Sequence, residues 1–520
     1  MVRSLAIVRG VALVGLEPLE VRVEATCSPG LPVLRLVGLP DAAVREAGDR
    51  VRTAIQRHGL RWPGERVVVN LAPAELPKVG SAFDLPLAIA VLAATGQVPL
   101  GGDPAVWACG ELGLDGSVRA VTGQLPLMIG ARRLGARRLL VPADAAGEAA
   151  LVPDLDVLAV ADLGEVVAAL TGQLPPRPVA RPVARSVSVD TARPAMRTWS
   201  VDTIGDLAEV RGQHLARRAV ELAAAGGHHL LLSGPPGCGK TLLAERLPGL
   251  LPDLTPEQAL EVAAIRALVG ERRSDDPLPH RPPLRAPHQV GSAAALVGGG
   301  AGVPRPGEVT LAHRGVLVLD ELLEIPRAVL DALRQPLERG EVLLSRARAR
   351  VTYPAAVLLV AAANPCPCGH LGDPHRECTC PPERIRRYRA RLSGPLLDRI
   401  DLQVELQPLS AAELLAAAPG EPTATVAARV HAARARAAGR WGGGTLNRDV
   451  DTDRLRATTH PTALDRLAAA VAATGGSARS HDRTLRVART IADLADVEVV
   501  AIDHVDEALA YRLPPLPVPA

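Results

Sequence analysis

Residues 229–247 read HLLLSGPPGCGKTLLAERL, which joins an apolar strand, a glycine-rich turn and the start of a helix. The turn at 234–241, GPPGCGKT, fits the pattern G-x-x-x-x-G-K-[ST] and lies where that pattern belongs, after a strand and before a helix. Its glycines let successive backbone N–H groups face one phosphate, and the helix N-terminus adds a favourable dipole. This stretch predicts an α/β domain that binds a nucleoside triphosphate.

Two side chains of this loop have specific expected roles. Lys240 would place a compact charge on the β- and γ-phosphates, and Thr241 would give an oxygen ligand to Mg²⁺. The alternative is a chance glycine- and proline-rich turn, and the flanking strand and helix argue against it. We therefore expect ATP and Mg²⁺ as cofactors. The remaining loop residues, which would surround the phosphates, are Gly234, Pro235, Pro236, Gly237, Cys238 and Gly239.

A second apolar strand, VLVL at 316–319, ends in two acids, Asp320 and Glu321. Parallel sheets bind ligands beyond the carboxyl ends of their strands. Asp320 is therefore expected to bind Mg²⁺, directly or through water, and Glu321 to polarise the attacking water. The alternative is an ordinary strand that happens to end in two acids.

Two further positions complete the expected site. A third apolar strand at 356–363 ends in Asn364, whose amide would orient the lytic water or sense the γ-phosphate. In SGPLLDRIDL, residues 393–402, Arg399 is a candidate arginine finger. Such an arginine completes a neighbouring subunit's site and compensates the charge of the transition state.

The overall composition limits the class of protein. With 520 residues, 48% apolar and 22% charged, the chain is long enough for several domains and is globular, not disordered. Its net charge of +3 excludes a polybasic-tail protein. No stretch predicts a membrane span, and residues 1–15, without a leader cleavage site, predict a first strand. We expect no membrane partner.

Lysine and cysteine are unevenly used. Only Lys78 and Lys240 are lysines among the 59 basic residues, and the other 57 are arginines. We attribute this to coding bias, so a lone arginine carries no functional signal, whereas a retained lysine invites a question. Four of the seven cysteines lie within 366–380, which is not the spread of a disulfide framework. A reducing cytoplasm is the expected location.

A composition shift divides the chain. Residues 175–200 are rich in proline and arginine and predict an extended linker between 1–174 and 201–520. The first part alternates expected strands with expected helices, a mixed α/β pattern. Its strands are expected at 6–14, 19–26 and 67–71, and its helices at 41–58, 85–94 and 125–134.

The second part divides again. Residues 201–409 open with an expected helix at 207–225 and form a larger α/β domain, whereas 410–520 read as almost entirely helical. The expected helices of the last part are 411–418, 423–438, 461–474, 480–495 and 503–511.

Four motifs, in this order along the chain, resemble those of AAA+ ATPases of the magnesium-chelatase-like branch: GPPGCGKT, VLVLDE, AAANP and GPLLDRIDL. RAPHQVGSAAALVGGG at 285–300, NPCPCG at 364–369 and SARSHDRTLRVARTIADLA at 477–495 are similar to the YifB/ComM family in particular. The resemblance spans nearly the whole chain except the linker. It implies an N-terminal Lon/S5-like α+β domain, a P-loop AAA+ α/β domain with a helix-2 insertion near 291–302, and a C-terminal helical lid.

The resemblance also implies roles and partners. Asn364 matches sensor 1, Arg399 the arginine finger, and Arg479 sensor 2, a lid arginine that touches the γ-phosphate. The family implies a hexameric ring with sites at subunit interfaces, working as a DNA motor of helicase or branch-migration type in DNA uptake and recombination. A magnesium-chelatase ATPase subunit and a protein-remodelling chaperone are the alternatives. The chaperone is disfavoured because peptide-threading rings present an aromatic pore loop, and aromatic residues make up only 2% of this chain.

The segment EVLLSRARARVTY, residues 341–353, alternates apolar and basic positions and predicts a hairpin before the third strand. In a ring its arginines would project into the pore and bind the phosphates of single-stranded or branched DNA whatever the sequence. The alternative is a solvated edge hairpin. The candidate DNA contacts are Arg346, Arg348 and Arg350.

Four cysteines form two C-x-C pairs separated by nine residues: Cys366, Cys368, Cys378 and Cys380. Four thiolates can bind Zn²⁺ tetrahedrally, although C-x-x-C is the commoner spacing. His370 and His375 are possible substitute ligands, and free thiols are the alternative. The role of a metal here would be structural, shaping the pore or a subunit contact.

The residues of the first domain argue against a protease activity. Ser81 lies near Lys78, but the position that resembles the catalytic lysine of Lon proteases, after Gly123-Gln124-Leu125, is Pro126. No other lysine is available, and proline cannot act as a base. We therefore expect no protease activity.

Overall fold

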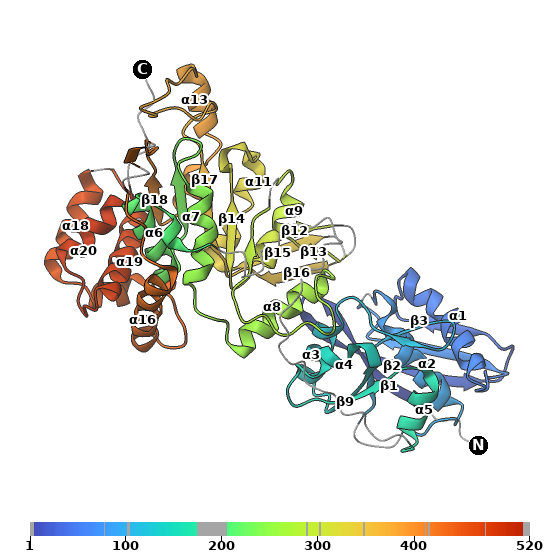
Figure 1. Cartoon of the computed structure of the whole chain (residues 1–520). Helices are drawn as coiled ribbons and strands as arrows, with labels where there is room; N and C mark the ends of the chain where they lie inside the picture. The colour runs from blue at the N-terminus through green and yellow to red at the C-terminus, as the bar shows by residue number, and fades with distance from the viewer. Residues whose placement is uncertain are drawn as a thin grey trace.

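The computed structural model of the chain describes residues 5–76, 78–100, 105–173, 205–287, 290–300, 303–346, 349–410, 412–413, 417–473 and 475–512. They form an N-terminal lobe, blue to teal in Figure 1, and a larger lobe, green to red, which meet beside helix α8 (Pro256–Leu268). The linker expected at 175–200 lies outside the described residues. So do Arg348 and residues 411 and 414–416 of the helix expected at 411–418.

The N-terminal lobe contains a seven-stranded sheet with the order β3-β4-β2-β1-β5-β8-β9. Helices cover both faces: Val8 and Ala12 pack in one core with α1 and α2, whereas Val11 packs in another with α3. The expected strands and helices are confirmed, with ends shifted by at most two residues. The bounds are β1 (Ala6–Val14), β2 (Glu17–Ser28), β3 (Leu34–Val37), β4 (Arg66–Ala72), β5 (Trp107–Ala108), β8 (Arg138–Pro142), β9 (Asp156–Val160), α1 (Ala42–Arg57), α2 (Asp84–Ala94) and α3 (Gln124–Arg133).

The larger lobe contains a five-stranded parallel sheet with the order β11-β14-β17-β10-β18. Its three central strands are short apolar runs, as strands covered on both faces must be. Because they run parallel, the segments that follow β14, β17 and β10 meet at one edge of the sheet. The bounds are β10 (Leu230–Ser233), β11 (Leu284–Arg285), β14 (Val316–Leu319), β17 (Leu358–Ala363) and β18 (Leu402–Glu405).

The helix expected at 207–225 is wrong at its start. Residues Leu207–Glu209 form a separate 3-10 turn, and α6 spans His214–Gly226. The chain breaks at Gly212 and Gln213, whose φ angles are +62° and +49°. A left-handed pair cannot continue a right-handed helix, so the apolar periodicity extends beyond the helix itself.

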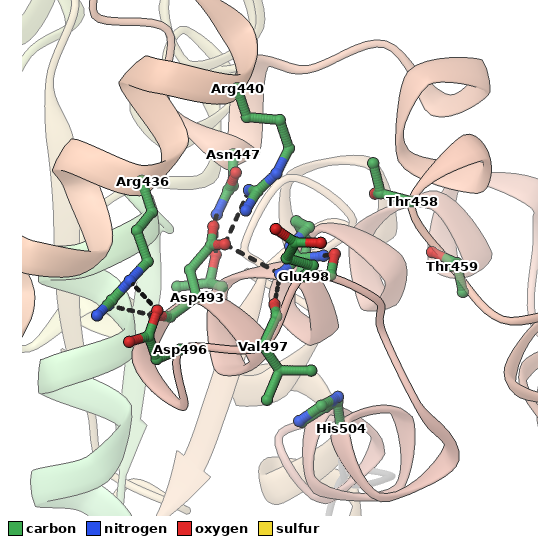
Figure 2. Close-up of polar contacts among 12 residues, drawn as sticks. Arg436, Arg440, Asn447, Thr458, Thr459, Asp493, Asp496, Val497, Glu498 and His504 are labelled. Atoms are coloured by element: carbon green, nitrogen blue, oxygen red, sulfur yellow. Dashed lines mark hydrogen bonds and ion pairs between the residues drawn. The ribbon is translucent and has the colours of Figure 1, made fainter.

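The last part of the chain is helical, with α17 an element the sequence did not predict. Asp493 of α19 is buried, and its carboxylate lies 2.8 Å from Arg440 of α16, 2.8 Å from Asn447 and 3.0 Å from Arg489. Figure 2 shows Arg440 and Asn447 pointing toward Asp493. A shared carboxylate of this kind fixes the helices in one arrangement. None of the helices in the described ranges is long and apolar enough to cross a membrane. The bounds are α16 (Thr423–Trp441), α17 (Thr452–Ala457), α18 (Pro461–Ala473), α19 (Ala478–Leu494) and α20 (Ile502–Ala510).

The two lobes share a hydrophobic core. Ala263 and Ala267 of α8 are buried in the same cluster as Leu125 and Met128 of α3. At its rim Arg272, just after α8, lies 3.5 Å from the buried Glu148 of the N-terminal lobe. The packing of α8 on α3 therefore sets how the N-terminal lobe sits on the larger one.

Candidate nucleotide site

The loop 234–239 leaves β10 and opens helix α7 (Lys240–Arg246), as the motif requires. Gly237 and Gly239 have φ angles of +81° and +93°, a region that L side chains rarely adopt. Gly234 is required for a different reason: a Cβ there would lie 2.5 Å from the carbonyl oxygen of Leu406. The glycines are thus needed for backbone shape and for close packing, which a chance turn would not need.

Lys240 lies at the centre of this loop. Its Nζ donates to the carbonyl oxygens of Gly234 at 2.7 Å and Pro235 at 2.8 Å, and to Asn364 Oδ1 at 3.1 Å. Burial lowers the pKa of this ammonium, and the nearby Cys238 and Asp320 oppose that shift. The two carbonyl oxygens and the Asn364 amide oxygen that accept from Lys240 are neutral, and a phosphate oxygen can replace them. The ammonium is therefore available for an anionic ligand.

The candidate magnesium ligands are already paired. Thr241 Oγ1 donates to Asp320 Oδ2 at 2.7 Å, which joins the start of α7 to the end of β14. Asp320 Oδ1 in turn accepts the Glu321 backbone N–H at 2.8 Å. Both partners are oxygen donors, which Mg²⁺ prefers, so the pair suits that ion.

Glu321 is held in an unusual backbone conformation. Its φ angle is +48°, which costs a residue with a Cβ about 1 kcal/mol. Glu321 is exposed and directly follows Asp320 at the carboxyl edge of the sheet. Strain of this kind gathers at functional positions.

Arg399 lies at the other edge of the sheet. It precedes β18, whose Leu402 pairs with Leu230 of β10, so it is at the amino ends of the strands while the P-loop is at their carboxyl ends. Its guanidinium contacts Glu338 and donates to the Pro395 carbonyl at 2.6 Å. Arg479, exposed in the first turn of α19, also acts on Glu338: hydrogen bonding by Arg399, together with the charges of Arg399 and Arg479, lowers the pKa of that carboxyl. The structure therefore places Arg399 at the edge of the sheet opposite the P-loop of its own chain, and the charge of Arg479 acts on the same carboxylate that holds Arg399.

Two residues of this edge had no sequence signal. Glu338, on α12 (Arg334–Arg339), is the acid that holds Arg399. Asp401, two residues after Arg399, is buried 3.4 Å from His228 and 3.6 Å from Arg483 of α19. Asp401 thus links the candidate finger segment to the helical part. Contacts in the folded structure, not a sequence motif, identify these two acids.

The predicted hairpin is confirmed as β15 (Glu341–Arg346) and β16 (Ala349–Pro354). Its base is anchored by buried Val342, Leu344, Val351 and Tyr353. Arg346, at the end of β15, and Arg350, in β16, are both exposed, and Arg350 also lines a cleft of about 730 Å³ between the two lobes. Of the two candidate DNA arginines that the structure describes, Arg350 therefore faces the N-terminal lobe across this cleft and Arg346 does not line it.

The four clustered cysteines converge. The Sγ atoms of Cys366, Cys368, Cys378 and Cys380 all lie within 4.8 Å of one another. His370 is not part of the group, because its Nδ1 lies 3.0 Å from Asp373 Oδ2. The backbone N–H of His375 donates to the same carboxylate at 2.9 Å. The donor set is thus four sulfurs, which suits Zn²⁺.

The candidate dyad of the first domain is not assembled. Ser81 Oγ donates to Glu111, and the fully buried Lys78 donates its Nζ to the Pro73 carbonyl. Gln124 donates to Cys109 Sγ at 3.0 Å, so it too is engaged elsewhere. These contacts give Ser81 no general base of the Lon type.

Comparison with known proteins agrees with this geometry. The family model described as Magnesium chelatase, subunit ChlI, matches residues 206–414. Two further models match the flanking parts: Subunit ChlI of Mg-chelatase at 23–145, and Magnesium chelatase, subunit ChlI C-terminal, at 420–512. A 149-residue stretch is 33% identical to Lon protease 2 of Bacillus subtilis, over 27% of this chain and 26% of that one.

Full-length relatives are found as well. An uncharacterized protein of Mycobacterium tuberculosis is 47% identical over 506 residues, 96% of this chain and 97% of its own. YifB of Escherichia coli is 43% identical over 513 residues, and the competence protein ComM of Haemophilus influenzae 41% over 517, each covering 98% of this chain and 97% of theirs. The chain therefore belongs to the YifB/ComM family of magnesium-chelatase-like AAA+ proteins.

Proposed function

We propose that the protein hydrolyses ATP with Mg²⁺ and works as a ring-shaped DNA motor, of helicase or branch-migration type, in the cytoplasm during DNA uptake and recombination. The observation that carries the ATPase part is the contact of Lys240 with Asn364 beside the Thr241–Asp320 pair at one edge of the sheet. Three strands far apart in sequence deliver these groups to one place. Such convergence is expected of a phosphate site.

Each of these side chains then has a specific role in ATP hydrolysis. Lys240 exchanges its carbonyl partners for phosphate oxygens, while Thr241 and Asp320 hold the metal. Bound Mg²⁺ would neutralise charge on the β- and γ-phosphates. Glu321 accepts a proton from the attacking water, and the Asn364 amide orients that water.

The position of two arginines supports the proposal of a ring. Arg399 and Arg479 both act on Glu338 at the edge opposite the P-loop. We propose that they complete the site of a neighbouring subunit, because an arginine finger must reach the γ-phosphate. A closed hexamer would give every chain one site and one donor of arginines.

The DNA part rests on the relative named competence protein ComM and on the exposed Arg346 at the end of β15. A magnesium-chelatase ATPase subunit is the second candidate, because the matching models carry that description. In both cases the four cysteines would hold a structural Zn²⁺.

The test is an ATP-dependent junction assay. A fluorescent three-way or Holliday junction is incubated with wild type, Lys240→Ala and Glu321→Gln. We expect strand movement by the wild type alone, with Glu321→Gln binding ATP and junction but turning over about 10²-fold more slowly. Absence of strand movement by the wild type under all salt conditions would contradict the proposed motor function. ATPase stimulation by a porphyrin or a peptide, and not by DNA, would favour the chelatase or chaperone alternative.

A further inference from the structure

The four-cysteine cluster lies directly against the nucleotide site. Cys366 is buried and stands two residues after Asn364, the residue that accepts from Lys240. Gly369, within the same loop, approaches the P-loop so closely that a Cβ would lie 2.8 Å from Pro236 Cδ. The segment 364–369 therefore touches the phosphate loop twice, once through a side-chain amide and once through backbone packing.

The sulfur geometry is that of a metal site. Three Sγ–Sγ distances are 3.3 Å for Cys366–Cys368, 3.6 Å for Cys366–Cys378 and 3.6 Å for Cys368–Cys378. Zn–S bonds of about 2.3 Å put the sulfurs of a tetrahedron about 3.8 Å apart, so a small expansion accommodates the ion.

Backbone N–H groups also approach the sulfurs. Backbone N–H groups of His370 and Thr379 hydrogen-bond to Cys368 Sγ, and the N–H of Cys368 to Cys380 Sγ. Donors in this outer position stabilise the charge of bound thiolate and orient it.

We infer that Cys366, Cys368, Cys378 and Cys380 bind one Zn²⁺ ion, and that this metal holds the loop 366–380 against the P-loop so that Asn364 stays facing Lys240. Arg389 of α13 (Pro382–Arg389) also holds the segment that follows Asn364, because its Nε donates to the Pro365 carbonyl at 3.1 Å. The metal acts as a clamp on the nucleotide site. The second half of the inference rests on the proposed ATPase function.

The metal is tested first, without nucleotide. Full-length wild type, Cys378→Ser and the control Cys27→Ser, whose thiol lies in β2, are analysed for zinc by mass spectrometry and by release with a mercurial. We expect one zinc per chain in wild type and control, and loss in Cys378→Ser. Cobalt-loaded wild type should show the visible bands of tetrahedral thiolate coordination. Wild type without zinc, without those bands and with the four thiols paired as disulfides would overturn the site.

The clamp is tested separately with Gly369→Ala, which keeps all four cysteines but adds a Cβ facing Pro236. Binding of a fluorescent ATP analogue should weaken about three- to tenfold both in this variant and on zinc removal from wild type. Unchanged nucleotide affinity both in Gly369→Ala that retains its zinc and in zinc-depleted wild type would overturn the clamp. A wild type that contains zinc but binds no ATP would instead defeat the proposed ATPase.

Discussion

Lys240 and Arg399 lie at opposite ends of two neighbouring parallel strands. Lys240 follows the carboxyl end of β10, Arg399 precedes the amino end of β18, and Leu230 of one strand pairs with Leu402 of the other. Four strand residues span roughly 13 Å, and both residues lie beyond that span. Arg399 therefore faces away from the phosphate site of its own chain.

A mixing experiment tests whether Arg399 acts on a neighbour. Alone, Arg399→Ala should lower turnover about 10³-fold, and Lys240→Ala should abolish it. Mixed in equal amounts, the two variants should recover activity, because random assembly pairs an intact P-loop with an intact Arg399 at about a quarter of the interfaces. Steady-state ATPase assays measure this. No recovery in mixtures that co-assemble would contradict action between subunits.

The two lysines of the chain provide a matched comparison. Lys240→Arg should weaken ATP binding at least about 10²-fold, because a planar guanidinium cannot reproduce the compact ammonium among three closely placed acceptors. Lys78→Arg should instead lower the melting temperature and leave ATP affinity unchanged, since Lys78 is fully buried in the other lobe. Fluorescent-nucleotide titration and thermal unfolding distinguish the two. Equal ATP affinity in wild type and Lys240→Arg would show that the ammonium is not needed.

The hairpin prediction concerns DNA. Arg346→Ala combined with Arg348→Ala should weaken DNA binding and reduce the slope of log K against log salt by about one for each lost phosphate contact. Arg350→Ala is the comparison, because Arg350 lines the cleft between the lobes and should change the slope less. Fluorescence anisotropy across a salt series measures both. An unchanged slope in the double variant would remove the hairpin from the DNA interface.

Stability should depend on pH through Glu148. Burial raises the pKa of this carboxyl to about 7, although Arg272 opposes the shift. The unfolded chain has a pKa near 4.3, so between the two values the folded state holds a proton that the unfolded state has lost. The stabilisation is full below the unfolded pKa and is lost as pH rises through about 7. We expect the melting temperature of wild type to fall from about pH 4.5 to about pH 7 more than that of Glu148→Gln. Parallel curves would contradict this.

The sequence predicts those parts of the candidate site whose residues are contiguous in the chain. The P-loop, the acids after β14 and Asn364 after β17 are each encoded in one short motif, and their meeting follows from parallel strands. The four cysteines were also visible as a cluster. The contact of Gly369 with Pro236, the pairing of Arg399 with Glu338 and the place of Arg479 depend on register and on packing between distant segments. The start of α6 was missed because apolar spacing does not reveal a left-handed break.

The hydrophobic core shared by α3 and α8 couples the two lobes, so that they move together. Cutting the chain between them would not release the N-terminal lobe, because Ala263 and Ala267 would remain buried against Leu125 and Met128. A fragment starting at residue 205 would expose this apolar strip to water and would aggregate more readily. Any rotation of α8 during the ATP cycle would carry the N-terminal lobe with it as a lever arm.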